Sequence, residues 1–212
     1  MSIADLRREY SRMGLHERTL DPNPFRQFAT WFEQALSAEI LDANAMTLAT
    51  ASREGKPSAR IMLLKGFDDL GFVFFSNYES RKGQELAENP YAALVFFWAE
   101  LERQVRITGK ISRISRQDTE EYFQNRPPGS QLGALVSRQS QVINSPEELE
   151  SRLQALETQY QGKTVPVPAY WGGYLLSPDT FEFWQGRPNR LHDRLRYTLQ
   201  PAGSWLIERL SP

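Results

Sequence analysis

The chain has 212 residues, of which 40% are hydrophobic and 24% charged, as expected for a globular domain with a sizeable core. Its 25 Lys and Arg residues against 26 Asp and Glu give a net charge of −1. No overall field therefore favours nucleic acid or an anionic membrane, and any anion site must be local. The absence of cysteine excludes disulfides, thiolate catalysis and cysteine-ligated metals, and the presence of only two histidines argues against a histidine-rich metal site.

The N-terminus is charged, and no segment has the apolar length of a signal peptide core or a membrane span. We therefore expect a cytoplasmic protein without a membrane partner. Residues 1–22 contain the charged run LRREY, then Gly14 and Pro22, and predict a flexible N-terminal segment. A single domain is expected over residues 23–212.

The first firm helix is predicted from Pro24, with Asn23 as its cap. Phe25, Phe28, Phe32, Ala35 and Leu36 recur at helical spacing, which favours a core-facing stripe over a cofactor site.

Strands are predicted next, joined by short turns. Residues 45–53 and 57–67 form a first pair, and residues 72–76 follow. The apolar run 91–98 indicates a strand buried on both faces, and residues 103–114 alternate cleanly between apolar and polar. Consecutive strands with short connections predict an antiparallel meander closed into a barrel.

Two helices are predicted to interrupt the strands. Ser115 and Asp118 resemble a capping box for a helix that ends near Asn125, and residues 126–130 are interpreted as a break and loop. Ser145-Pro146-Glu147-Glu148 is a stronger capping signal for a helix that stops at Gly162. Strands return over residues 171–177, 181–185, 196–200 and 204–210, giving a mainly β fold with peripheral helices.

Residues 187–196 hold Arg187, Arg190, His192, Arg194 and Arg196. Arginine suits bidentate recognition of phosphate or carboxylate and also stacks on flat rings. Beside Trp184, this run indicates a site for a flat anionic molecule, with a solvated loop as the alternative. In an extended segment, Arg190 and His192 point to the same side, with Leu191 opposite.

A second candidate anion site lies at Arg81-Lys82, in the first turn of a helix after Ser80. Cations are disfavoured there unless an anion is also bound; solvated side chains are the alternative. Arg60 and Lys65 have opposite parity in one strand, so either a bulge intervenes or they serve different anions.

Several polar positions stay ambiguous by themselves. Gln104 is either a ligand donor or a solvent-facing amide. Tyr122, Arg126 and Ser130 could gather three phosphate donors, although Tyr122 also fits a plain helix stripe. Ser137-Arg138-Gln139-Ser140 is either a donor cluster or a solvated loop. No dinucleotide-binding, Walker, zinc-protease or serine-hydrolase motif is present, whereas flavin chemistry needs only positioning and electrostatics from the protein.

Taken in order along the chain, LRREY, RIMLLK, SRKGQEL, LERQVRITGK, YFQNRPPGSQLGALVSRQSQ, WGGY with FEFWQG, and RLHDR resemble the motifs of the pyridoxine (pyridoxamine) 5′-phosphate oxidase family. The resemblance implies a split antiparallel β-barrel that binds FMN, a homodimer with each flavin at the subunit interface, and a C-terminal dimerisation region over about residues 170–212. No metal is implied.

The resemblance also implies site residues. Flavin contacts fall on Arg60, Ile61, Met62, Leu63, Leu64, Lys65, Phe75, Ser76, Arg81, Lys82, Gln104, Gln139, Ser140, Trp184 and Arg194. Substrate contacts fall on Arg7, Tyr10, Lys65, Tyr122, Arg126, Ser130, Arg190 and His192; Arg190 and His192 are also the implied catalytic residues. No role falls on Arg187. Phe75 stands where the family commonly has tyrosine, which puts a phenol role there in doubt.

The implied reaction oxidises pyridoxine phosphate or pyridoxamine phosphate to pyridoxal phosphate. A hydride passes from C4′ to flavin N5, and O2 is reduced to hydrogen peroxide; the amine substrate also releases ammonia. Alternatives are a split-barrel flavin-binding protein without this activity and a pyridoxal phosphate carrier.

Overall fold

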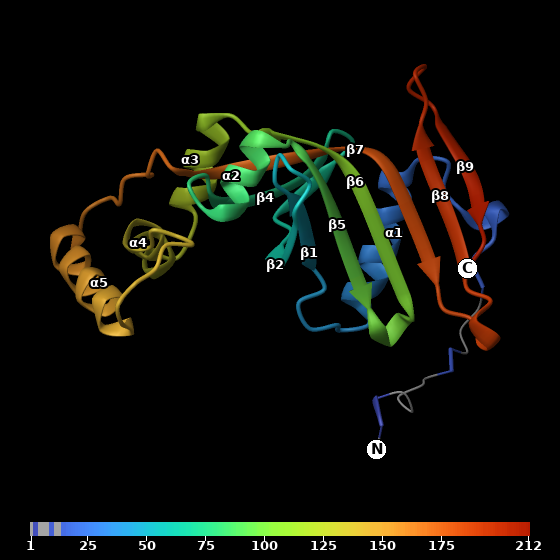
Figure 1. The fold of residues 1–212 in the computed structure, drawn as a ribbon, viewed down its shortest axis with the longest axis horizontal. Helices are drawn as coiled ribbons and strands as arrows, with labels where there is room; N and C mark the ends of the chain where they lie inside the picture. The colour runs from blue at the N-terminus through green and yellow to red at the C-terminus, as the bar shows by residue number, and fades with distance from the viewer. Residues whose placement is uncertain (1, 4–8, 11–13) are drawn as a thin grey trace.

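The computed structural model describes residues 2–3, 9–10 and 14–212 (Figure 1). Within them, nine strands form one antiparallel sheet. The strands are β1 (Ala45–Ala51), β2 (Pro57–Leu63), β3 (Gly66–Asp68), β4 (Gly71–Asn77), β5 (Tyr91–Trp98), β6 (Arg103–Arg113), β7 (Trp171–Gln185), β8 (Asp193–Leu199) and β9 (Trp205–Leu210). The helices are α1 (Pro24–Ser37), α2 (Arg81–Glu88), α3 (Arg116–Gln124), α4 (Pro128–Val136) and α5 (Pro146–Tyr160), with 3-10 turns η2 (Glu17–Thr19), η3 (Ala99–Leu101) and η4 (Pro188–Arg190).

The sheet runs in the order β2-β1-β5-β6-β7-β4-β3, and β8 and β9 continue from the other half of β7. Only residues 64–65 connect β2 to β3, although these strands lie at opposite ends of the path. The sheet must therefore curl back on itself, which confirms the mainly β, barrel-like fold. The order is not a plain meander, because β1 pairs with β5 and β4 pairs with β7.

β7 is the element around which the molecule branches. Its first half, residues 171–176, pairs with β4, and its second half, residues 180–185, pairs with β8. In Figure 1 it extends from the α3–α5 side of the molecule to the β8–β9 hairpin. Fifteen residues in one strand separate what lies at its two ends by roughly 40 Å.

α1 fills the inside of the curled sheet, as its aromatic stripe predicts. Asn23 Oδ1 accepts the Phe25 N–H at 2.8 Å and caps the helix. Phe28 is fully buried, with ring centres of Phe67 and Phe72 each 4.9 Å away and that of Phe96 at 5.1 Å. The stripe differs from the prediction at one end: Leu36 is 55% exposed, whereas Trp31 is buried.

The structure corrects several predicted elements. Residues 57–67 are two strands, since β2 ends at Leu63. β5 is buried on one face only, because Tyr91 and Phe97 are more than half exposed in this chain. Residues 171–185 are one strand instead of two.

Two corrections concern helices. The segment interpreted as a break and loop contains α4, whose first turn carries Ser130. Ser145 makes no side-chain cap at α5; instead the Asn144 N–H donates to Glu148 at 3.1 Å. The predicted Ser115 cap of α3 is confirmed by its bond from the Asp118 N–H at 3.0 Å.

One residue of the N-terminal segment packs into the main core. Leu15 is 7% exposed and belongs to that core, whereas residues 16–19 are exposed. The flexible segment over residues 1–22 and the single domain over residues 23–212 stay predictions. Arg7 lies outside the described residues.

Candidate functional site

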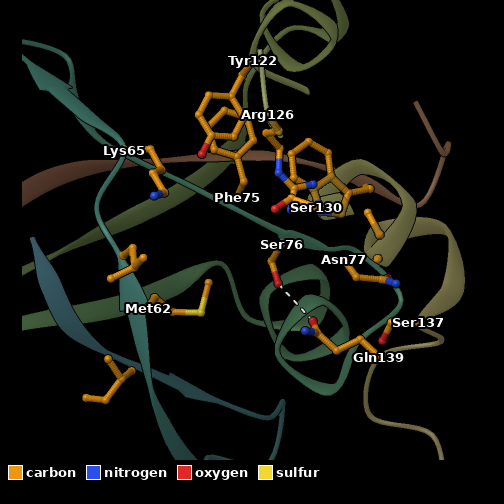
Figure 2. A pocket seen from close by; sticks show the side chains of 15 residues that line it. Met62, Lys65, Phe75, Ser76, Asn77, Tyr122, Arg126, Ser130, Ser137 and Gln139 are labelled. Carbon is orange, nitrogen blue, oxygen red and sulfur yellow. Dashed lines mark hydrogen bonds between the residues drawn. The ribbon is translucent and has the colours of Figure 1, made fainter. Parts of the chain in front are cut away.

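A pocket of about 510 Å³ lies between β2, β4 and the helices α3 and α4 (Figure 2). Ten of the residues implied by the resemblance line it: Ile61, Met62, Leu63, Lys65, Phe75, Ser76, Tyr122, Arg126, Ser130 and Gln139. Segments separated by up to 78 residues in the chain are therefore brought together around one cavity. Figure 2 shows the Lys65 and Tyr122 side chains directed into it.

One wall of the pocket is an aromatic stack. The Phe75 ring lies on the Tyr122 ring with centres 3.8 Å apart and planes at 10°. The nearly parallel Trp171 ring lies beside both, 5.4 Å from Phe75 and 6.2 Å from Tyr122. The Arg126 guanidinium lies 4.7 Å from the centre of the Trp171 ring. These planar contacts hold Tyr122 and Arg126 at the pocket, and no ion pair with either side chain is found among the described residues.

Arg126 has an unusual environment for a charged group. Its Nη1 atom is buried and has no hydrogen-bond partner in the described structure. Burial lowers the pKa of Arg126, partly offset by Tyr122. A buried guanidinium nitrogen without an acceptor is costly, so Arg126 has donor capacity available for an anion.

A cationic group adjoins the pocket at the start of α2. The Lys82 ammonium is largely buried and donates to Gln139 Oε1 at 2.9 Å, and Ser76 Oγ lies 3.3 Å from the same oxygen. The Arg81 N–H donates to Ser140 Oγ at 3.2 Å. Burial, followed by repulsion from Arg60, lowers the pKa of Lys82. Gln139 and Ser140 are exposed, but their side chains contact the start of α2 and Ser76; their role in binding a ligand stays a prediction.

Glu85 is a member of this group that sequence reasoning did not include. It receives hydrogen bonds from Thr50 and Ser58 at 2.5 Å each, and it pairs with Arg81 at 2.9 Å and Arg60 at 3.4 Å. Its i,i+4 spacing from Arg81 was a visible signal. Glu85 therefore balances two of the three cations in part, whereas no ion pair in the described part of the chain involves Lys82.

Lys65 and Leu64 lie outside the strand on which the expected alternation of side chains was based. Both follow the end of β2, so the expectation of opposite faces for Arg60 and Lys65 does not apply. Leu64 is 4% exposed and packs in the core away from the pocket.

Five further implied residues gather at the other end of β7. Gln104, Trp184 and Arg194 are directly paired across β6, β7 and β8. The rings of Trp184 and His192 are 4.7 Å apart, and Tyr10 lies 5.6 Å from each. We refer to Tyr10, Gln104, Trp184, His192 and Arg194 as the distal cluster.

Within the distal cluster, Arg194 is bound by a carboxylate that the sequence pattern did not identify. Its Nε and Nη2 donate to the two oxygens of buried Glu182 at 2.9 and 3.1 Å. That hydrogen bonding raises the pKa of Arg194. Glu182 precedes Arg194 by twelve residues and reaches it only because β7 and β8 pair.

The turn before β8 is not extended. Asn189 and Arg190 have φ of 56° and 63°, so Arg190 and His192 do not follow the strand alternation predicted for them. The Arg187 N–H donates to His192 Nδ1 at 3.1 Å, which gives Arg187 a contact that the resemblance did not imply. Burial, followed by repulsion from Arg190, lowers the pKa of His192.

Two kinds of feature are absent from the described residues. No helix there is long and apolar enough to cross a membrane. No group of three or more His, Asp or Glu side chains there could hold a metal ion.

Comparison with known proteins gives consistent relationships. Residues 32–160 match the family model described as pyridoxamine 5′-phosphate oxidase, and residues 171–212 match that of the pyridoxine 5′-phosphate oxidase C-terminal dimerisation region. The chain is 62% identical over 212 residues to a pyridoxine/pyridoxamine 5′-phosphate oxidase of Cyanothece sp., covering 100% of this chain and 99% of that one. A counterpart from Paraburkholderia phymatum is 56% identical over 211 residues, with 100% and 99% covered.

Solved structures agree with this relationship. PhzG from Burkholderia lata, in complex with tetrahydrophenazine-1-carboxylic acid, matches with a TM-score of 0.89 and 27% identity over 96% of this chain and 100% of that chain. An FMN-binding protein of Nostoc punctiforme shares the fold with a TM-score of 0.70 at 18% identity, covering 94% of this chain and 100% of that one. From its fold, its pocket and its full-length relatives, the chain belongs to the pyridoxamine 5′-phosphate oxidase family.

Proposed function

We propose that the chain is an FMN-dependent oxidase that converts pyridoxine 5′-phosphate and pyridoxamine 5′-phosphate to pyridoxal 5′-phosphate, with O2 reduced to hydrogen peroxide. Its family membership and its full-length relatives support this activity. The observation on the molecule itself that carries it is the buried, unpartnered Nη1 of Arg126 at the pocket.

The residues beside α2 fit an FMN phosphate. Arg60, Arg81 and Lys82 carry three positive charges against the single carboxylate of Glu85, and Ser140 and Gln139 add polar groups. Clustered cations with free donors suit a phosphate. We assign the flavin to this group and to the adjoining pocket residues Ile61, Met62, Leu63, Lys65, Phe75 and Ser76.

The substrate phosphate fits the side of the pocket formed by α3 and α4. Arg126 offers its unpartnered nitrogen, and the Lys65, Tyr122 and Ser130 side chains line the same pocket. Their donors require no proton transfer to bind a phosphate at neutral pH.

We further propose that the enzyme is a homodimer in which the distal cluster of one copy completes the pocket of the other. The distal cluster lies at the far end of β7 from Trp171, too distant to reach the pocket of its own chain. The matched C-terminal dimerisation region spans β7, β8 and β9. The exposed Phe97, which pairs with Gln104, adds an apolar group to this face.

When bound, FMN supplies the acceptor for the hydride that leaves the substrate and passes the electrons to O2. The chain's own residues bind FMN and the substrate and orient them toward each other. His192 Nδ1 accepts a hydrogen bond, so the neutral ring carries its proton on Nε2 and can donate from that side. Arg190, with its charge and planar fork, is proposed to cover the substrate ring. The cytoplasmic location remains a prediction.

The test is the purified protein itself. We expect a yellow protein with about one FMN per chain that oxidises pyridoxine 5′-phosphate and releases hydrogen peroxide with it. A yellow protein without turnover would favour a flavin-binding protein. A colourless protein that binds pyridoxal 5′-phosphate and gains no flavin spectrum on titration would favour a carrier, and either result contradicts the proposal.

A further inference from the structure

A buried carboxylate ties the N-terminal segment to the turn that carries His192. Asp193 is 3% exposed. It accepts the Leu15 N–H at 2.9 Å, Arg209 Nη1 at 2.6 Å and Arg187 Nη1 at 3.3 Å. Although burial opposes ionisation, these donors lower the pKa of Asp193. One side chain thereby joins residues that are up to 194 positions apart.

Arg209, on β9, is the centre of this network. Besides Asp193, its guanidinium donates to Leu15 O at 3.0 Å and to both oxygens of Glu17 at 2.8 and 2.9 Å. The bond from Arg209 lowers the pKa of Glu17 to about 2. We call residues 14–17 the strap and the Asp193–Arg209–Glu17 contacts the clamp. Bidentate pairing of this kind fixes orientation as well as distance.

Two glycines allow the N-terminal segment to approach the turn closely. A Cβ on Gly14 would lie 2.8 Å from Asp193 Oδ2, and one on Gly186 would lie 2.6 Å from Cγ of Tyr10. Tyr10, four residues before the strap, contacts Trp184 and His192 edge-on. The contact thus depends on close fit at two separate points.

We propose that Arg209 is a positioning residue: through the clamp it keeps the strap docked, and the docked strap holds Tyr10 against Trp184 and His192. In the described part of the chain, no cation–ring contact joins Arg209 to Tyr10, Trp184 or His192; Arg209 acts through Asp193 and the strap. The identity of the ligand at the distal cluster rests on the proposed function. The coupling of Arg209 to Tyr10 through the clamp and the strap does not.

The first test removes the guanidinium. We expect Arg209→Gln to raise the KM for pyridoxine 5′-phosphate about tenfold while the flavin spectrum is kept. We also expect trypsin to cleave about tenfold faster within the first 18 residues, which contain Arg7, Arg8, Arg12 and Arg18. Arg152→Gln, which breaks an i,i+4 pair with Glu148 on α5, is the matched control and should change neither quantity.

A second variant leaves the clamp intact. Gly186→Ala removes the space for the Tyr10 ring by steric contact alone and should raise KM in the same way. It keeps the proposal testable if Arg209→Gln does not fold.

The decisive measurement is a double-variant cycle. If Arg209 acts through Tyr10, Tyr10→Ala/Arg209→Gln has the same KM as Tyr10→Ala alone. A KM raised by the product of the two single effects would overturn the proposal, since a merely structural role of Arg209 would add independently.

The two proposals fail in different ways. A protein that does not oxidise pyridoxine 5′-phosphate contradicts the proposed function, and the cleavage rates of the same variants still test the clamp. Unchanged cleavage in Arg209→Gln, with normal oxidase activity in the wild type, contradicts the clamp alone.

Discussion

Arg126 illustrates how a single side chain reports on a ligand. Its guanidinium lies 4.7 and 5.6 Å from the ring centres of Trp171 and Phe123, yet its Nη1 has no acceptor among the residues that the structure describes. Ring stacking positions the group but gives this nitrogen no acceptor. In the function that we propose, the substrate phosphate supplies that acceptor.

Arg126→Ala should therefore weaken substrate binding and leave FMN in place. Charge-assisted hydrogen bonds contribute ~1.5–3 kcal/mol each, so the affinity for pyridoxine 5′-phosphate should fall about ten- to a hundredfold. Titration monitored by the flavin spectrum measures this. Arg113→Ala is the control, because Arg113 also stacks on a ring, that of Tyr78 at 3.9 Å, but does not line the pocket. An unchanged affinity in Arg126→Ala would remove Arg126 from the phosphate site.

Phe75 stands where the family commonly has tyrosine, and the structure shows that its side chain makes ring contacts. Its ring stacks on Tyr122 at 3.8 Å and lies 5.4 Å from the nearly parallel ring of Trp171, so these contacts use a planar ring and not a hydroxyl. We expect Phe75→Tyr to change the free energy of unfolding by less than about 0.5 kcal/mol. Phe75→Leu should lose about 1–2 kcal/mol through the stack and the buried area. Urea unfolding at fixed protein concentration compares them; equal midpoints would show that the stack contributes nothing.

At the scale of elements, α2 and β2 share one buried carboxylate. Burial alone would raise the pKa of Glu85. Hydrogen bonds from Ser58, Thr50 and Arg81 outweigh burial and lower this pKa from 4.5 to about 2. A pKa that is lower in the folded than in the unfolded state contributes stability above pH 4.5, and this contribution is lost as the pH falls towards 2.

The expected result is that Glu85→Gln destabilises the protein at pH 7 and that its difference from wild type shrinks between pH 4.5 and 2. Unfolding midpoints along this pH series measure the effect. Glu88→Gln, on the exposed side of the same helix, should match wild type throughout. If the stability difference between Glu85→Gln and wild type instead grew as the pH falls, the pKa of Glu85 would be raised and not lowered in the folded state.

At the scale of the whole molecule, β7 keeps two groups of site residues apart. The pocket lies beside Trp171 and the distal cluster beside Trp184, at the two ends of the strand (Figure 1). In the homodimer that we propose, a second copy brings its distal cluster to the pocket of the first, and twofold symmetry repeats this arrangement at the other pocket.

Mixing two defective chains should restore activity. Lys82→Ala damages the pocket side and Arg194→Ala the distal side, so each homodimer is impaired at both sites. A heterodimer has one intact site, and random mixing should recover about a quarter of wild-type activity. The measurement is activity after the two variants are unfolded and refolded together. No recovery, or a fully active monomer in sedimentation, would contradict the composite site.

The sequence by itself determined what depends on neighbouring residues. The helical stripe and the Asn23 cap of α1, the Ser115 cap of α3 and the apolar alternation of β6 all involve residues within about one turn or two strand positions of each other. The family also followed from contiguous motifs such as RIMLLK and RLHDR, because a contiguous motif can be recognised without knowing which of its residues meet in the folded protein.

Only the tertiary structure decided which charges meet. Glu85 reaches Arg60 from 25 residues away, and Arg209 reaches Glu17 from 192. No spacing rule links such residues, since their contact is created by strand pairing and helix docking. Arg187 is a different case, because its N–H donates to His192 Nδ1 only five residues away, across a turn with positive φ at Asn189 and Arg190. Strand pairing also explains why residues that are adjacent in the proposed site lie at opposite ends of β7. Periodicity specifies which face of a strand a side chain occupies, but the pairing of whole strands sets where that face lies in the molecule.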